Sequence, residues 1–131
     1  MNKYELLIDI DYKPKRWNRW CEEFVSKLRF ASINLGLEIG KVKVYETNKG
    51  LHIYIDVYSE LKLNSKDICF IQLLLGSDYK RELFNWIRIR GRYRGKWNVL
   101  FINKERTTDY SRSVESRINR LISEREEEVS T

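Results

Sequence analysis

Two segments of the chain alternate between aliphatic and polar residues, and this alternation constrains the fold more than any other feature. In residues 4–11, one face carries Leu6, Ile8 and Ile10, and the other carries Leu7, Asp9 and Asp11. In residues 51–58, one face carries Leu51, Ile53, Ile55 and Val57, and the other carries His52, Tyr54, Asp56 and Tyr58. A period of two predicts β-strands. Because both aliphatic faces must be covered, we expect helices on that side of one sheet.

The rest of the chain predicts helices and two further strands. Residues 17–35 carry apolar side chains at spacings of three and four, which predicts an amphipathic helix that stops at Gly36. The later pattern predicts a strand at residues 41–47, a tight turn at Asn48-Lys49-Gly50, a helix capped by Asn64 or Ser65, a helix capped by Ser77 or Asp78, and a strand at residues 97–103. Residues 86–90 fit either the end of the last of these helices or a strand, and we favour the helix.

This order of elements predicts an α+β fold of the split βαβ type, as in ferredoxin-like and RNA-recognition-motif domains. Right-handed connections give an antiparallel four-stranded sheet in the order fourth, first, third, second, with helices on one face. We assign this domain to residues 1–106. Residues 107–131 form a polar C-terminal tail with a weak helical stripe, which fits a terminal helix, a contact in a homodimer or a frayed end.

Antiparallel pairing of the first and third strands predicts a cluster of polar side chains on the open face of the sheet. Asp9 and Asp11 end the first strand, and His52 begins the third, so the three should converge. Two neighbouring carboxylates repel each other unless a cation offsets their charge, which favours Mg²⁺ or Mn²⁺ bound by Asp9 and Asp11. The alternative is two solvated acids beside a structural histidine. If His52 is exposed, replacing it with alanine should change stability by less than about 1 kcal/mol.

Positive charge is concentrated in the second half of the chain. The net charge is +6, whereas residues 79–106 alone hold nine cations and two glutamates. Trp86, Tyr93 and Trp97 lie among these cations, a pattern typical of phosphate contact combined with base stacking. The predicted nucleic-acid-binding residues are Arg81, Arg88, Arg90, Arg92, Arg94 and Lys96. The alternative is a solvated basic segment that only keeps the protein in solution.

These motifs resemble the catalytic core of the archaeo-eukaryotic primase and primase-polymerase superfamily. The resemblance lies in Asp9-Ile10-Asp11 and, some 35 residues later, in Thr47-Asn48-Lys49-Gly50-Leu51-His52. These match an Asp-x-Asp and a Ser-x-(Arg/Lys)-Gly-x-His motif, with threonine in place of serine. The chain resembles the small stand-alone form carried by rod-shaped archaeal viruses (rudiviruses), over roughly residues 4–104.

The resemblance implies roles for particular residues. Asp9 and Asp11 would bind the metal, Thr47, Lys49 and His52 would contact the phosphates of an incoming nucleoside triphosphate, and Asp9, Asp11 and His52 would form the catalytic group. Active primases carry a third metal-binding aspartate on a later strand, and residues 96–103 contain none. We therefore expect a minimal or degenerate replication core that binds nucleotides with a metal and associates with DNA or RNA.

Other classes of function remain as alternatives. The main one is a non-enzymatic module of the RNA-recognition type that binds single-stranded nucleic acid, with Tyr45, Tyr54 and Tyr58 on the open face. A purely structural viral protein also fits the fold. A two-histidine replication nuclease is disfavoured because His52 has no histidine partner.

Composition bounds the environment of the protein. Cys21 and Cys69 lie far apart within apolar helical patterns, which favours reduced, buried thiols. No apolar run approaches about 18 residues, so we expect no membrane span. We expect an intracellular protein, in the host cytoplasm if it is viral.

Overall fold

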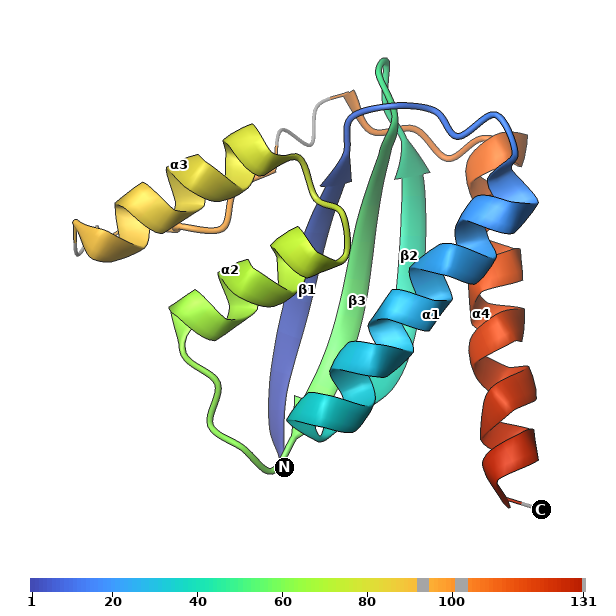
Figure 1. The fold of residues 1–131 in the computed structure, drawn as a ribbon. Helices are drawn as coiled ribbons and strands as arrows, with labels where there is room; N and C mark the ends of the chain where they lie inside the picture. Colours follow the sequence, from blue (N-terminus) through green and yellow to red (C-terminus); the bar gives the residue numbers. More distant parts are fainter. Residues whose placement is uncertain (92–94, 101–103, 131) are drawn as a thin grey trace.

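The computed structural model describes residues 1–91, 95–100 and 104–130, and it has an α+β fold (Figure 1). In chain order its elements are β1 (Asn2–Ile10), α1 (Trp17–Leu35), β2 (Leu37–Glu46), β3 (Leu51–Ser59), α2 (Ser65–Leu74), α3 (Tyr79–Arg90) and α4 (Asp109–Ser130). Residues 86–90 belong to α3, so the helical interpretation is confirmed. Within the described residues, no helix is both long enough and apolar enough to cross a bilayer.

The three strands form one antiparallel sheet in the order β1-β3-β2. Leu6 lies opposite Ile55, and Ile8 lies opposite Ile53, as alternation on a shared apolar face requires. The predicted pairing of the first and third strands is confirmed. The prediction of a fourth strand is wrong: residues 97–100 form no strand, and the other predicted residues, 101–103, lie outside the described residues.

Side chains occupy the edge of β1 where the fourth strand was predicted. The backbone N–H of Leu7 donates to Oε1 of Gln72, and that of Asp9 donates to Oγ of Ser77, both at 3.0 Å. The carbonyl of Leu7 accepts from Nη1 of Arg81 at 2.8 Å. Backbone groups at a buried edge must find partners, and here they find them on α2, α3 and the loop between these helices. A strand is therefore not needed at this edge.

The core lies on one face of the sheet, beneath α1 and α2, as Figure 1 shows. The helix α4 closes the opposite edge, where the backbone N–H of Val44 in β2 donates to Oε1 of Glu115 at 2.8 Å. Val114 and Ile118 of α4 are fully buried in the same core. The weak apolar stripe of the predicted tail thus belongs to a helix that packs against α1 and β2.

Local signals fix the ends of the helices. Gly36 stops α1 with a φ of 62°, a left-handed conformation that glycine adopts without a Cβ clash. Asn64 and Asp67 form a reciprocal capping box at the start of α2. Asp78 caps α3 by accepting from the backbone N–H of Arg81. The end of α1 and the starts of α2 and α3 all lie where the sequence predicts them.

Candidate functional site

Asp9 and His52 face each other across neighbouring strands, on the side of the sheet away from the core. They are directly paired in the register of β1 and β3. Nε2 of His52 lies 3.6 Å from Oδ1 of Asp9, and Nδ1 lies 2.8 Å from Oε1 of Glu105. The expectation of an open face is wrong at this point, because the His52 side chain is only 8% exposed. Glu105 covers and orients the ring.

A cleft of about 420 Å³ opens beside this pair. Its walls come from the end of β1, the start of β3, one face of α3 and the segment after it. The lining residues are Asp9, His52, Asp78, Lys80, Arg81, Phe84, Arg88, Val99 and Leu100. Carboxylates and an imidazole therefore meet cations and an apolar wall in one hollow, a combination typical of sites for charged ligands with an apolar part.

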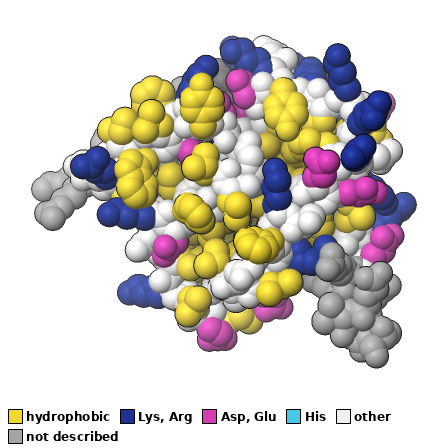
Figure 2. All heavy atoms as spheres, viewed as in Figure 1, with side chains coloured by type: hydrophobic (Ala, Val, Ile, Leu, Met, Phe, Trp, Pro, Cys, Tyr) yellow, Lys and Arg dark blue, Asp and Glu magenta, His cyan; other side chains and the backbone are white. Residues whose placement is uncertain are grey.

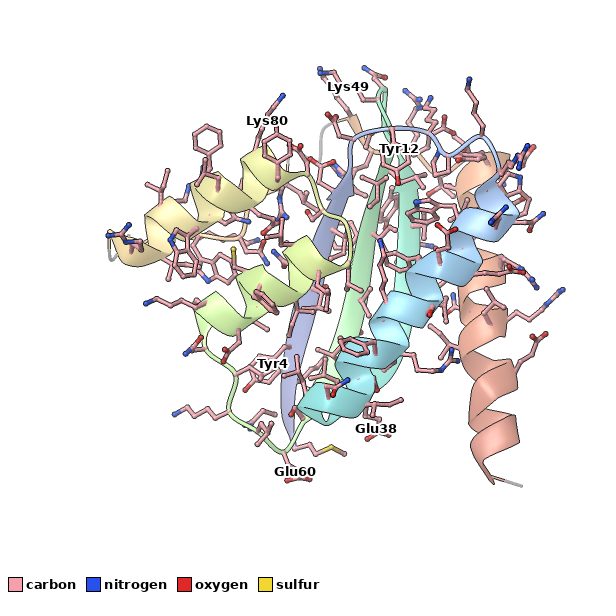
Figure 3. The ribbon with its side chains drawn as sticks, viewed as in Figure 1. Tyr4, Tyr12, Glu38, Lys49, Glu60 and Lys80 are labelled. Atoms are coloured by element: carbon pink, nitrogen blue, oxygen red, sulfur yellow. The ribbon has the colours of Figure 1, made fainter. Side chains whose placement is uncertain are left out.

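The helix α3 supplies the cations of the cleft. Arg81, Phe84 and Arg88 follow each other at spacings of three and four, so they form one stripe along the helix. The start of α3 is fixed to β1, because the backbone N–H of Asp78 donates to the carbonyl of Asp9 at 2.6 Å. Lys80 is exposed at the start of the helix, where its Nζ lies 5.8 Å from the centre of the Tyr79 ring (Figure 3).

Burial dominates the electrostatics of Asp9. It raises the pKa of this carboxyl group, whereas the neighbouring His52 and Arg81 lower it, and the negative charges of Asp11 and Asp78 raise it further. The net direction is upward. A carboxylate in this environment is destabilised by its surroundings, and either a proton or a cation beside Asp9 would offset that cost.

Arg81 is mainly committed to the fold. Its side chain is 10% exposed, and it pairs with the buried carboxylate of Glu82. Nε donates to the carbonyl of Val99 at 2.8 Å, and Nη2 donates to Oδ1 of Asn98 at 2.6 Å. Together with its bond to Leu7, these contacts use most of its five N–H groups. The Arg88 side chain is less committed to the fold than that of Arg81, because its bonds to Asn85 and to the carbonyl of Trp97 are longer, at 3.2 and 3.4 Å.

The other predicted residues lie outside the cleft. Asp11 is exposed, one residue beyond the end of β1. Thr47 closes the hairpin, since its Oγ1 accepts from the backbone N–H of Gly50 at 3.0 Å. A Cβ at Gly50 would collide with the carbonyl of Ile10, so this glycine allows close approach of the chain after β1. Lys49 is exposed at the hairpin tip (Figure 3).

Only part of the predicted arginine segment lies within the described residues. Arg90 and Lys96 are exposed and do not line the cleft, and Arg92 and Arg94 lie outside the described residues.

Figure 2 shows hydrophobic side chains gathered over α2 and α3. The exposed members on these helices are Phe70, Leu73, Tyr79, Leu83, Phe84, Trp86 and Ile87. Phe84 joins this apolar surface to the cleft.

Several residues of the site were not predicted as site residues, among them Lys80 and Phe84 of α3. Asp78 shares the cleft with Asp9, although the sequence indicated only a helix cap. Glu105 is separated from His52 by 53 residues, and no spacing pattern connects them. Among the side chains that the structure describes, which belong to residues 1–91, 95–100 and 104–124, no group of three or more histidine, cysteine, aspartate or glutamate residues is arranged to hold a metal ion.

Comparison of the chain with protein-family models, with curated proteins and with solved structures found no match.

Proposed function

We propose that the cleft binds the phosphates of a nucleotide together with Mg²⁺ or Mn²⁺, in a nucleic-acid-associated replication protein related to minimal primase cores of archaeal viruses. One observation carries this proposal: a single cleft brings Asp9, His52 and Asp78 against Lys80 and Arg88. Acidic groups alone would repel phosphates. A site for phosphates alone would need only the cations, so the carboxylates require a further, positively charged ligand. A metal-nucleotide complex satisfies both sets of charges.

The carboxylates of the cleft fit a magnesium-type ion that is shared with the ligand. Such ions are commonly held by one or two carboxylates, with substrate phosphates and waters completing the shell. Asp9 and Asp78 supply two carboxylates, and the upward pKa shift of Asp9 is what a nearby cation would offset. When bound, the ion would neutralise phosphate charge and polarise the phosphoryl group. Asp11 lies nearby but outside the cleft lining, so we assign it a weaker, electrostatic part.

The remaining lining residues have separate tasks. Glu105 holds Nδ1 of His52, which leaves Nε2 to face Asp9 and a phosphate oxygen beside it. Lys80 and Arg88 would pair with the outer phosphates. Phe84 and Leu100 offer an apolar wall to the base or sugar. Binding is the activity proposed here, because active primases need a third metal-binding carboxylate.

The arrangement of elements supports the family relation in part. The order β1, α1, β2, β3, α2, with β1 beside β3, follows the split βαβ pattern of ferredoxin-like and RNA-recognition-motif domains. We propose that this chain is a three-stranded variant, in which side chains of α2 and α3 take over the edge of the missing strand.

Recognition of single-stranded nucleic acid by the open sheet face is less well supported. The hollow on that face includes three acids, Glu5, Asp56 and Glu105, beside two lysines. The Tyr54 hydroxyl donates to Glu105, and its ring packs edge-on against Tyr45, with ring centres 5.6 Å apart. Acidic groups repel phosphates, and a tyrosine held in this way is poorly placed to stack on a base.

Titration calorimetry with a nucleoside triphosphate in the presence of Mn²⁺ tests the proposal. Lys80→Ala should weaken binding about tenfold, since one charge-assisted phosphate contact is worth roughly 1.5 kcal/mol or more. Lys66→Ala is the matched control: Lys66 is also exposed, and its Nζ lies 5.5 Å from the ring centre of Trp86, outside the cleft lining. Its affinity should equal that of the wild type.

Asp9→Asn tests the metal separately. Binding by this variant should no longer differ between samples with and without Mn²⁺, because one of the two cleft carboxylates is lost. Absence of triphosphate binding by the wild type at millimolar concentration would refute the proposed function. Equal weakening by the Lys80 and Lys66 variants would refute the location.

A further inference from the structure

A second hollow lies where the start of α1 meets α4, and it is rich in arginine. Its volume is about 670 Å³, and its lining residues are Trp17, Asn18, Arg112, Ser113, Ser116, Arg117 and Arg120. We refer to it as the α1/α4 groove. Every polar side chain in this lining can donate a hydrogen bond, and none is acidic. The groove shares no residue with the cleft.

The amphipathic character of α4 explains this lining. Residues 112, 113, 116, 117 and 120 recur at spacings of one, three and four, which places them on one face of the helix. Val114 and Ile118 lie on another face and are fully buried in the core. Packing of the apolar face against α1 and β2 therefore leaves the arginine face beside the first turn of α1.

The donors of these arginines are poorly used within the protein. Arg112 pairs with exposed Asp109 at 3.5 Å, and Arg117 pairs with exposed Glu22 at 3.2 Å. The carboxylates of both pairs are open to solvent, and such pairs are weak and exchange readily for another anion. Within the described part of the chain, Nε of Arg117 is buried without a hydrogen-bond partner. Arg120 is exposed and bonds to no described group.

The first turn of α1 adds to the positive character of the groove. Arg16 is at the N-cap position, makes no side-chain cap bond, and no acidic residue follows in the first turn. Free backbone N–H groups and the helix dipole therefore add positive potential next to the arginines. Trp17 is half-buried and supplies the aromatic surface of the lining.

We propose that the α1/α4 groove binds the phosphodiester backbone of a nucleic acid. Arg112 and Arg120 are eight residues apart, which corresponds to roughly 12 Å along the helix. Each strand of duplex DNA advances by about 3.4 Å along the helix axis per phosphate, so this row of donors spans several phosphates and suits a chain of them better than a single one. Serine and asparagine side chains are also frequent backbone contacts. The lining holds no aliphatic side chain of the kind that a lipid surface or an amphipathic peptide would cover.

This proposal does not depend on nucleotide binding in the cleft. The test measures fluorescence anisotropy of labelled DNA, single-stranded and duplex, over a series of salt concentrations. The test variant is Arg112→Gln/Arg120→Gln, in which both residues are exposed. The matched control is Lys27→Gln/Lys62→Gln, which removes the same charge from exposed lysines that bond to no described group.

We expect the groove variant to bind duplex DNA with a log–log salt slope smaller by about 1.8, since each lost phosphate contact is worth about 0.9. The control should keep nearly the wild-type slope, and both variants should keep the wild-type melting temperature. Triphosphate binding in the cleft should be unchanged in the groove variant. Equal slopes for the groove variant and the control would overturn the proposal. So would binding to vesicles of anionic phospholipid, or to inorganic phosphate alone, without binding to DNA.

Discussion

At the scale of single residues, the Glu105 carboxylate serves two side chains at once. Its Oε1 accepts from Nδ1 of His52 at 2.8 Å and from the hydroxyl of Tyr54. Burial, and then the hydrogen bond to Glu105, raise the pKa of Tyr54, so the phenol remains the donor in this pair. His52 is therefore held in place by the fold, while its other ring nitrogen faces the cleft.

Replacing His52 with alanine should consequently destabilise the protein. The variant loses the bond to Glu105 and leaves a nearly buried carboxylate with one partner fewer, which costs about 1–3 kcal/mol. Urea denaturation measures this loss, and Lys49→Ala at the exposed hairpin tip serves as the control. A loss below about 0.5 kcal/mol for His52→Ala would contradict the packing described here.

Glu46 should make stability depend on pH. Hydrogen bonds from Lys13 and then Thr108 lower the pKa of Glu46 below its ordinary value, against the opposing effect of burial. A carboxyl group whose pKa is lower in the folded state stabilises it above the pKa of the unfolded chain, and this contribution is lost as pH falls through the folded value.

Glu46→Gln should therefore be less stable than the wild type at pH 7, and the difference should shrink below about pH 4.5. Thermal unfolding between pH 7 and pH 3 measures this difference. Glu60→Gln is the control, because Glu60 is exposed and bonds to no described group. A difference that stays constant over this range would show that the bonds of Glu46 do not stabilise the folded state.

At the scale of elements, Gln72 connects α2 to the edge of β1. It is fully buried, and its Oε1 accepts from the backbone N–H of Leu7 at 3.0 Å and from Nδ2 of Asn98 at 2.7 Å. Its Nε2 donates to Oε1 of Glu82 at 2.9 Å. Its bond to Leu7 is one of those that a neighbouring strand would supply, and Ser77 and Arg81 make the others.

Gln72→Leu keeps the apolar packing of this position but leaves the backbone N–H of Leu7 without its partner, while Glu82 keeps its bonds to Ser77, Arg81 and Asn85. We expect a loss of about 1–3 kcal/mol, the cost of one buried polar group without a partner. The amide of Leu7 should also exchange its hydrogen faster. Leu73→Gln, at an exposed position of the same helix, should change neither property, and protected exchange at Leu7 in the Gln72 variant would exclude this explanation.

The same edge shows what sequence can predict and what it cannot. The strands β1 and β3 follow from alternation, and the end of α1 follows from Gly36, because both signals are local. The pairing of the two strands follows from the order of the elements. The bonds of Gln72 and Arg81 to Leu7 join residues 65 and 74 positions apart, and no periodicity encodes them. For the same reason Asp9 and His52 were found by their register, whereas Glu105 was not.

At the scale of the whole molecule, the two basic surfaces, the arginines at the end of α3 and the α1/α4 groove, lie beyond opposite edges of the sheet. The helix α3, which ends in Arg90, lies beyond β1, whereas the starts of α1 and α4 lie toward the β2 side (Figure 1). Lys49 and Lys80 both lie at the upper end of the molecule in Figure 3. A nucleic acid that touched both basic surfaces would run across this end, past the cleft.

The arginines at and after the end of α3 test this path. Arg90→Ala/Arg92→Ala/Arg94→Ala should weaken DNA binding similarly across sequences, because phosphate contacts carry no base information. For single strands, the log–log salt slope should fall by about 2, at about 0.7 per contact. Residues 92 and 94 enter this prediction through the charge of the sequence alone.

Combining this triple substitution with Arg112→Gln/Arg120→Gln shows whether one strand spans the molecule. Distant sites that contact the same ligand lose binding energy independently, so the two decreases in slope should add. Anisotropy with single strands of increasing length measures the two decreases. The second set of substitutions should lower the slope further only for strands above a minimum length, because a short strand reaches one surface alone. If the combined variant has the slope of one parent at every length, the two surfaces do not share a strand. If the triple variant keeps the wild-type slope while remaining folded, the arginine segment is a solvated surface.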